Sequence, residues 1–122
     1  MRNAPRHFNL AQADEYVGYT QIMALWTDIG RERTQENIDI KVNKYVKVFN
    51  EIASENPSYG IIKTKKDLMD DSFSHKLMLA IEGGEAVGTE LSGVEKLYNM
   101  GVRAIALTWN NPYMISDTNS CA

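Results

Sequence analysis

The sequence has few of the residues on which several common protein classes depend. Its 122 residues include one cysteine, Cys121, so an internal disulfide and a cysteine-pair metal site are excluded, and a reducing, cytoplasmic location is indicated. No apolar run approaches the roughly 18 residues of a transmembrane helix, and the N-terminus lacks the apolar stretch of a secretory signal. A net charge of −3 argues against nucleic acid or an anionic membrane as a partner.

The composition that remains is that of a soluble globular protein. Hydrophobic residues make up 43% of the chain and charged residues 24%. A chain of this length is sufficient for one modest hydrophobic core. We therefore expect a single domain over residues 1–122.

Apolar patterning predicts strands that alternate with helices. Three strands are expected over residues 17–25, 76–82 and 102–109, with a brief extended piece at 59–62. Helices are expected over residues 34–56, 65–69 and 90–100, and a loop or short helix around 10–13. This alternation predicts an α/β fold with right-handed crossovers and a parallel sheet.

The helix boundaries rest on capping signals. Thr34, Thr64 and Thr89 are the expected N-terminal caps, and Asp67 adds a partial capping box to the second of them. Gly101 is expected to end the last helix. Four residues at helical spacing predict the buried face of that helix: Leu91, Val94, Leu97 and Tyr98.

The segment KLMLAIEGGE (76–85) carries the strongest functional signal. Its apolar run predicts a strand buried in a parallel sheet, and it ends in the carboxylate of Glu82 and two glycines. Ligands and catalytic groups gather at the carboxyl ends of such strands. Glu82 is therefore a candidate metal ligand; the alternatives are an acid that caps the next loop or that pairs with Arg103.

Other polar residues give weaker signals. His7 in HFN (7–9) resembles half of a metal-binding His-x-Asp pair, but an amide replaces the carboxylate, so a surface histidine is favoured. Trp26 and Asp28 are expected on the same edge of the sheet as Glu82, either lining a pocket or as a packed aromatic and a solvated acid. His75 is expected at the opposite edge, with a structural or solvated role.

Three blocks resemble the membrane (renal) dipeptidase family, the M19 zinc peptidases. IEGGEAVG (81–88) resembles the family's (V/I)-E-G-(G/A)-H segment, with Glu85 where histidine is usual. LSGVEKLYNMGVRAIAL (91–107) is similar to the helix and strand that follow in the family. HFNL (7–10) with Val17 and Gly18 is similar to the family's H-V-D-L-P loop and G-V-G-A-Q strand. The resemblance covers nearly the whole chain.

The resemblance implies a partial parallel (β/α) barrel, the N-terminal third of a TIM-barrel metallohydrolase truncated at both ends. Such enzymes hydrolyse dipeptides at a site with two zinc ions, and Glu82 takes the position of the bridging carboxylate. The family's His-x-Asp pair would precede residue 1, and its two later histidines would follow residue 122. The isolated chain is thus expected to be inactive.

Trp109 departs from animal members, which have a substrate-contacting histidine there, and agrees with the Leu-Thr-Trp-Asn of bacterial-type relatives. Trp109 and Asn110 are therefore the candidate substrate-binding residues. The alternative function is a non-catalytic assembly or binding module built on a partial barrel. Under either function, exposed strand edges predict self-association.

Overall fold

A computed structural model describes residues 10–27, 30 and 33–108. The element order is α1 (Leu10–Ala13), β1 (Tyr19–Trp26), α2 (Gln35–Glu55), β2 (Tyr59–Ile61), α3 (Lys65–Leu68), β3 (His75–Glu82), the 3-10 helix η1 (Gly84–Val87), α4 (Ser92–Asn99) and β4 (Val102–Ala106). His7, Asp28, Trp109, Asn110 and Cys121 lie outside the described residues. Strands and helices alternate as predicted.

All strand pairs of the sheet are parallel, and β3 is its central strand. β1 pairs with β3 along its full length, from Tyr19 opposite His75 to Trp26 opposite Glu82. β2 and β4 share the other edge of β3: β2 pairs with its amino-terminal end and β4 with its carboxyl-terminal end. The prediction of a parallel α/β sheet is confirmed.

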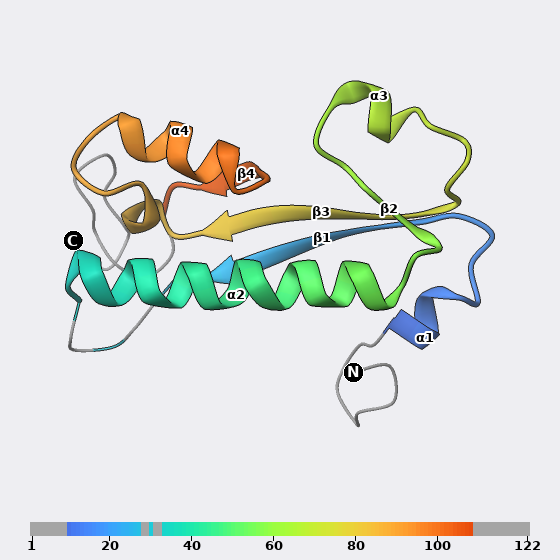
Figure 1. Cartoon of the computed structure of the whole chain (residues 1–122), viewed down its shortest axis with the longest axis horizontal. Helices are drawn as coiled ribbons and strands as arrows, with labels where there is room; N and C mark the ends of the chain where they lie inside the picture. The colour runs from blue at the N-terminus through green and yellow to red at the C-terminus, as the bar shows by residue number, and fades with distance from the viewer. Residues whose placement is uncertain (1–9, 28–29, 31–32, 109–122) are drawn as a thin grey trace.

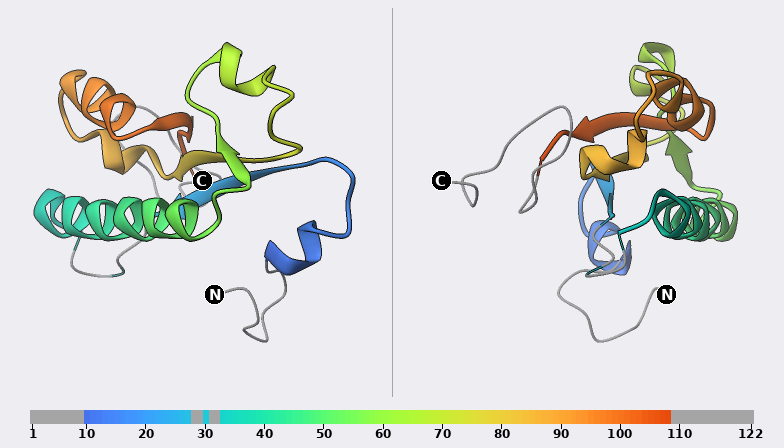
Figure 2. Two further views of the ribbon diagram at one scale, coloured as in Figure 1. Left: turned by 45° about the vertical axis from the view of Figure 1, so that its right-hand side comes forward. Right: turned by 90° about the vertical axis from the view of Figure 1, so that its left-hand side faces the viewer.

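One face of the sheet carries the core. Leu77, Leu79 and Ile81 alternate along β3 and are at most 1% exposed. They belong to one buried cluster with the apolar stripe of α2 and with Leu97 of α4. Figure 1 shows α2 running alongside β1 and β3 in the opposite direction, and both views of Figure 2 place α4 beside β4. Both helices thus pack on the same face of the sheet.

The opposite face is open over the outer strands. Thr20, Ile22 and Ala24 of β1 are exposed, as are Ala104 and Ala106 of β4. Successive residues of a strand point to opposite faces of the sheet, and Ile81 points to the core face. Glu82, which follows Ile81 and is paired with the exposed Ala106, therefore belongs to the open face.

The caps of α2 and α3 are as predicted. The Thr34 side chain accepts a hydrogen bond from the Asn37 N–H at 3.2 Å and so begins α2. Thr64 and Asp67 form a complete capping box at the start of α3. Both helices end within one residue of the predicted boundary.

The prediction for α4 was wrong at its start and on its buried face. The helix begins at Ser92, and Leu91, not Thr89, occupies the N-cap position without a side-chain capping bond. Leu97 is buried, whereas Leu91 is 86%, Tyr98 55% and Val94 45% exposed. Among the described elements, α4 has its main contacts with η1 and β4, and Leu97 is the one residue of Ser92–Asn99 that these contacts bury.

The strand limits also differ from the prediction. β1 begins at Tyr19, two residues later than predicted, because the pairing with β3 starts at Tyr19 opposite His75. Val17, which precedes this pairing, is 97% exposed. β4 ends at Ala106, three residues before the predicted end. The loop expected after Glu82 contains the short helix η1.

Candidate functional site

The structure places Glu82 at the carboxyl-terminal edge of the sheet, as the last residue of β3. Its Cα neighbours are Trp26 at the end of β1 and Ala106 at the end of β4. The side chain is half-buried. Strand ends of a parallel sheet are where loops and ligands converge, so this edge is the candidate functional site.

The backbone around Glu82 is held from both neighbouring strands. The Thr27 N–H donates to the Glu82 carbonyl at 3.2 Å, and the one Thr27 hydroxyl proton is shared between that carbonyl, at 3.0 Å, and Glu85 Oε1, at 2.7 Å. On the other side the Gly83 and Gly84 N–H groups donate to the carbonyls of Ala106 and Leu107, each at 3.0 Å. These bonds fix the Cα position from which the Glu82 side chain projects.

Gly83 is required by both its conformation and its surroundings. Its φ of +125° lies in a region that residues with a β-carbon rarely adopt. A β-carbon there would lie 2.0 Å from Thr27 Oγ1 and 2.6 Å from each carboxylate oxygen of Glu85. Glu85 and Thr27 therefore occupy the space that a side chain at residue 83 would need.

The Glu82 carboxylate has no hydrogen bond or ion pair with any other residue that the structure describes. Arg103 instead donates to the carbonyls of Lys63 and Tyr98, at 2.5 and 2.8 Å, and its guanidinium stacks on the Tyr98 ring. The first two N–H groups of the following loop donate to the carbonyls of Ala106, the last residue of β4, and of Leu107, the residue after it. Neither pairing with Arg103 nor capping of this loop start therefore accounts for Glu82.

Metal ligands do not cluster in the described part of the chain. Within residues 10–27, 30 and 33–108, no three His, Cys, Asp or Glu side chains are close enough to hold one ion. His75 lies at the opposite edge, where Nε2 is 3.0 Å from the Ala13 carbonyl and Nδ1 is 2.9 Å from the Ser74 hydroxyl. This histidine has the structural role that its position predicted.

Trp26 is a partly exposed aromatic at the same edge of the sheet. Its side chain is 45% exposed, and it alternates with the buried Leu25, so by position it belongs to the same open face as Glu82. The Lys41 ammonium of α2 lies 5.2 Å from the centroid of its ring and 5.7 Å from that of Tyr45. The pocket-lining and packed alternatives for Trp26 both stay predictions.

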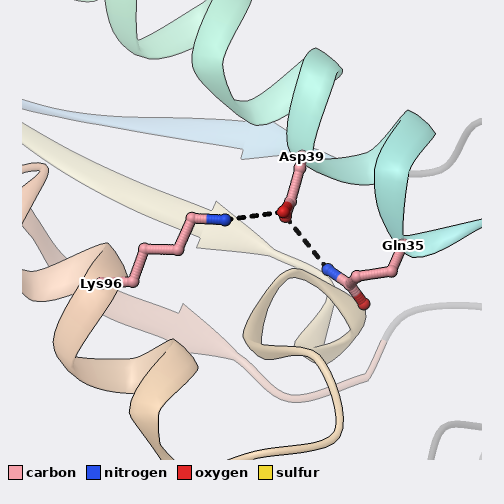
Figure 3. Close-up of polar contacts among 3 residues, drawn as sticks. All are labelled: Gln35, Asp39 and Lys96. Carbon is pink, nitrogen blue, oxygen red and sulfur yellow. Dashed lines mark hydrogen bonds and ion pairs between the residues drawn. The ribbon is translucent and has the colours of Figure 1, made fainter.

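A polar cluster that the sequence did not reveal joins α2 to α4 near this edge. Asp39 accepts hydrogen bonds from Lys96 at 2.7 Å and from Gln35 at 3.1 Å (Figure 3). Partial burial acts to raise the pKa of Asp39, but the hydrogen bonds from Lys96 and Gln35 and the charge of Lys96 outweigh it, so the pKa is lowered. The sequence placed Asp39 on a solvated face because Lys96 is 57 positions away.

The fold and this edge define the class: an α/β protein with a parallel sheet, a carboxylate at the carboxyl end of its central strand and a glycine-rich turn after it. Comparison with protein families identifies which one. Residues 1–120 match the membrane dipeptidase family (peptidase family M19). The chain belongs to this family, as its resemblance indicated.

A search of curated proteins gave no match. None of the helices in the described residues is long and apolar enough to cross a membrane.

Proposed function

We propose that this chain contributes Glu82 as the bridging carboxylate of a zinc-dependent dipeptidase. The family match supports hydrolysis of a peptide substrate. The observation that carries the assignment to Glu82 is its carboxylate: it projects from the open face at the carboxyl edge of the sheet, and no described side chain neutralises it. Free carboxylates at such edges are suited to bind cations.

The described residues fit one part of a zinc site. A catalytic zinc ordinarily has three protein ligands, and Glu82 supplies one. When bound, zinc would polarise the scissile carbonyl and lower the pKa of a bound water. The resemblance assigns the other ligands to a His-x-Asp pair before residue 1 and to two histidines after residue 122, so we propose that residues 1–122 alone are inactive.

The same proposal extends to the barrel and to substrate binding. Because α2 and α4 cover one face of the sheet, the strands can continue in one direction and curve toward the open face, as in a (β/α) barrel. Glu82 then faces the barrel interior. Trp109 and Asn110, three and four residues after β4, are proposed to contact the dipeptide at the same edge.

Metal analysis and activity assays test the proposal. The purified 122-residue chain should retain less than one tightly bound zinc ion and hydrolyse no dipeptide. The longest open reading frame that contains this segment should encode a His-x-Asp pair upstream and two histidines downstream.

In the full-length product of that reading frame, Glu82→Gln should lower the zinc content and should reduce the rate of dipeptide hydrolysis at least about 100-fold. Glu90→Gln changes an exposed acid of the following loop and should preserve both the zinc content and the rate.

Either of two results would overturn the proposal. The first is stoichiometric zinc with dipeptidase activity in the 122-residue chain, abolished by Glu82→Gln. The second is full zinc content and activity in the Glu82→Gln variant of the longer product.

The alternative function, a non-catalytic assembly module, is supported by the unpaired outer edges of the sheet. Among the described residues, β1 and β4 each pair with β3 alone. Exposed apolar side chains, including Ile22 at 52% and Leu107 at 52%, lie on or next to these strands. Unpaired edges flanked by apolar side chains favour self-association, which sedimentation velocity at increasing protein concentration measures.

A further inference from the structure

Thr27 has an unusual position for a threonine at a sheet edge. It directly follows β1, and only 1% of its surface is exposed. Its N–H and hydroxyl both bond to the Glu82 carbonyl, and the hydroxyl also lies 2.7 Å from Glu85 Oε1. One buried side chain from β1 thus contacts the peptide of the candidate ligand and the side chain of the loop after it.

Glu85 completes this arrangement from the other side of Gly83. Its carboxylate fills the space in which a β-carbon of residue 83 would lie. The carboxylate is therefore placed by the turn of η1 and held there by the Thr27 hydroxyl. Because hydrogen bonds to a charged acceptor are stronger than neutral ones, the shorter contact to Glu85 is the stronger of the two that the hydroxyl makes.

These contacts fix the backbone from which the Glu82 side chain projects. The carbonyl of Glu82 is fixed by Thr27, and the next N–H is fixed by Ala106. The Glu82 carboxylate itself has no bond to a described residue, so the restraints that this part of the chain places on Glu82 act on its backbone. Loss of the Thr27 hydroxyl would release the Glu85 carboxylate and leave the Glu82 carbonyl bonded to the Thr27 N–H alone.

We propose that Thr27 and Glu85 are positioning residues for Glu82, an inference that rests on the proposed function. Thr27 and Glu85 form a latch between the end of β1 and the loop 83–88, and the latch holds Glu82 in the orientation that a metal ion needs. A ligand that is held in place before binding loses less conformational freedom when the ion arrives. In this assignment Glu85 acts through Thr27 and does not itself bind metal.

A metal-free experiment tests the latch on the chain itself. Thr27→Val keeps the shape and removes the hydroxyl, Thr27→Ser keeps the hydroxyl, and Thr20→Val alters an exposed threonine of the same strand as the control. The readouts are Glu82 side-chain rotamer populations from NMR couplings and amide exchange at Gly83 and at Leu79. Thr27→Val should change the Glu82 rotamer populations and accelerate exchange at Gly83 about tenfold or more, with little change at Leu79.

The serine variant and the control should both resemble the wild type. The latch is refuted if Thr27→Val leaves the Glu82 couplings and Gly83 exchange unchanged. It is also refuted if Thr27→Val accelerates exchange at Leu79 as much as at Gly83, or if Thr27→Ser fails to restore both readouts, because the role would then be general packing.

A second arm connects the latch to metal binding. Zinc ions alone are titrated into the chain while the carboxyl carbon signals of Glu82 and of the exposed Glu90 are followed by NMR. Thr27→Val should raise the zinc concentration for half-saturation at Glu82 about tenfold and leave Glu90 unaffected, and an unchanged half-saturation at Glu82 would refute the positioning role. If Glu82 of the wild type fails to respond to zinc, the proposed function fails, while the metal-free readouts still decide whether the latch exists.

Discussion

Gly83→Ala is the substitution that tests this description of the site most directly. Two costs add at this position. A residue with a β-carbon at φ +125° costs on the order of 1–3 kcal/mol in backbone strain. The β-carbon would also displace Thr27 Oγ1, which would otherwise lie 2.0 Å away, and the Glu85 carboxylate.

Loss of the Thr27–Glu85 hydrogen bond adds roughly 1.5–3 kcal/mol, because its acceptor is charged and its donor is buried. The total is about 2.5–6 kcal/mol, a large share of the roughly 5–15 kcal/mol by which a domain is ordinarily stable. Urea unfolding followed by far-UV circular dichroism measures this free energy.

Two other glycines provide controls for the separate costs. Gly30 also has a positive φ, +75°, but no atom lies within 4 Å of its added β-carbon, so Gly30→Ala should cost about 1–2 kcal/mol from strain alone. Gly18 has ordinary φ and its nearest neighbour is the Ser74 carbonyl at 3.6 Å, so Gly18→Ala should change stability by less than about 0.5 kcal/mol. If Gly83→Ala unfolds at the same urea concentration as Gly30→Ala, the crowding described beside Gly83 is wrong.

Two further substitutions test the packing and the electrostatics around α4. Leu97→Ala should lower the free energy of unfolding in urea by about 2–5 kcal/mol, because Leu97 is 1% exposed. Leu91→Ala changes a leucine that is 86% exposed and should lower it by less than about 0.5 kcal/mol. Equal losses in the two variants would contradict the burial of Leu97 on α4. Asp39→Asn should remove about 0.5 kcal/mol at neutral pH, a small effect because the Lys96 and Asp39 side chains are 45% and 34% exposed. The pKa of Asp39 is lower in the folded state than in the unfolded chain. The stabilisation by the Asp39 carboxylate is therefore present above the ordinary aspartate pKa of about 4 and is lost as the pH falls through the lowered pKa. If the difference in stability between Asp39→Asn and the wild type stayed the same well below about pH 4, this role of the Asp39 charge would be contradicted.

The features that the sequence predicted correctly are those with local causes. Thr34 and Thr64 specify helix starts through bonds to residues three positions on, and the apolar run before Glu82 specifies a central strand. Family resemblance and strand order then placed Glu82 at the edge where it is found.

The features that it missed depend on residues far apart in the chain. The Thr27–Glu85 contact joins positions 58 apart, and nothing in the sequence around either residue indicates the other. The exposed Leu91 was predicted to be buried because helical periodicity marks an apolar face without specifying what, if anything, packs against it.

The division of β3 between two neighbours has a consequence for cooperativity. Its amino-terminal residues pair with β2, its last four with β4, and the register with β4 shifts between Leu79 and Ala80. Fraying at the α3 end of the molecule can therefore proceed without breaking any β3–β4 hydrogen bond. A sequence change near β2 can therefore affect the edge that carries Glu82 through two links: β1, which pairs with β3 along its full length, and the hydrogen bond from Arg103 of β4 to the Lys63 carbonyl.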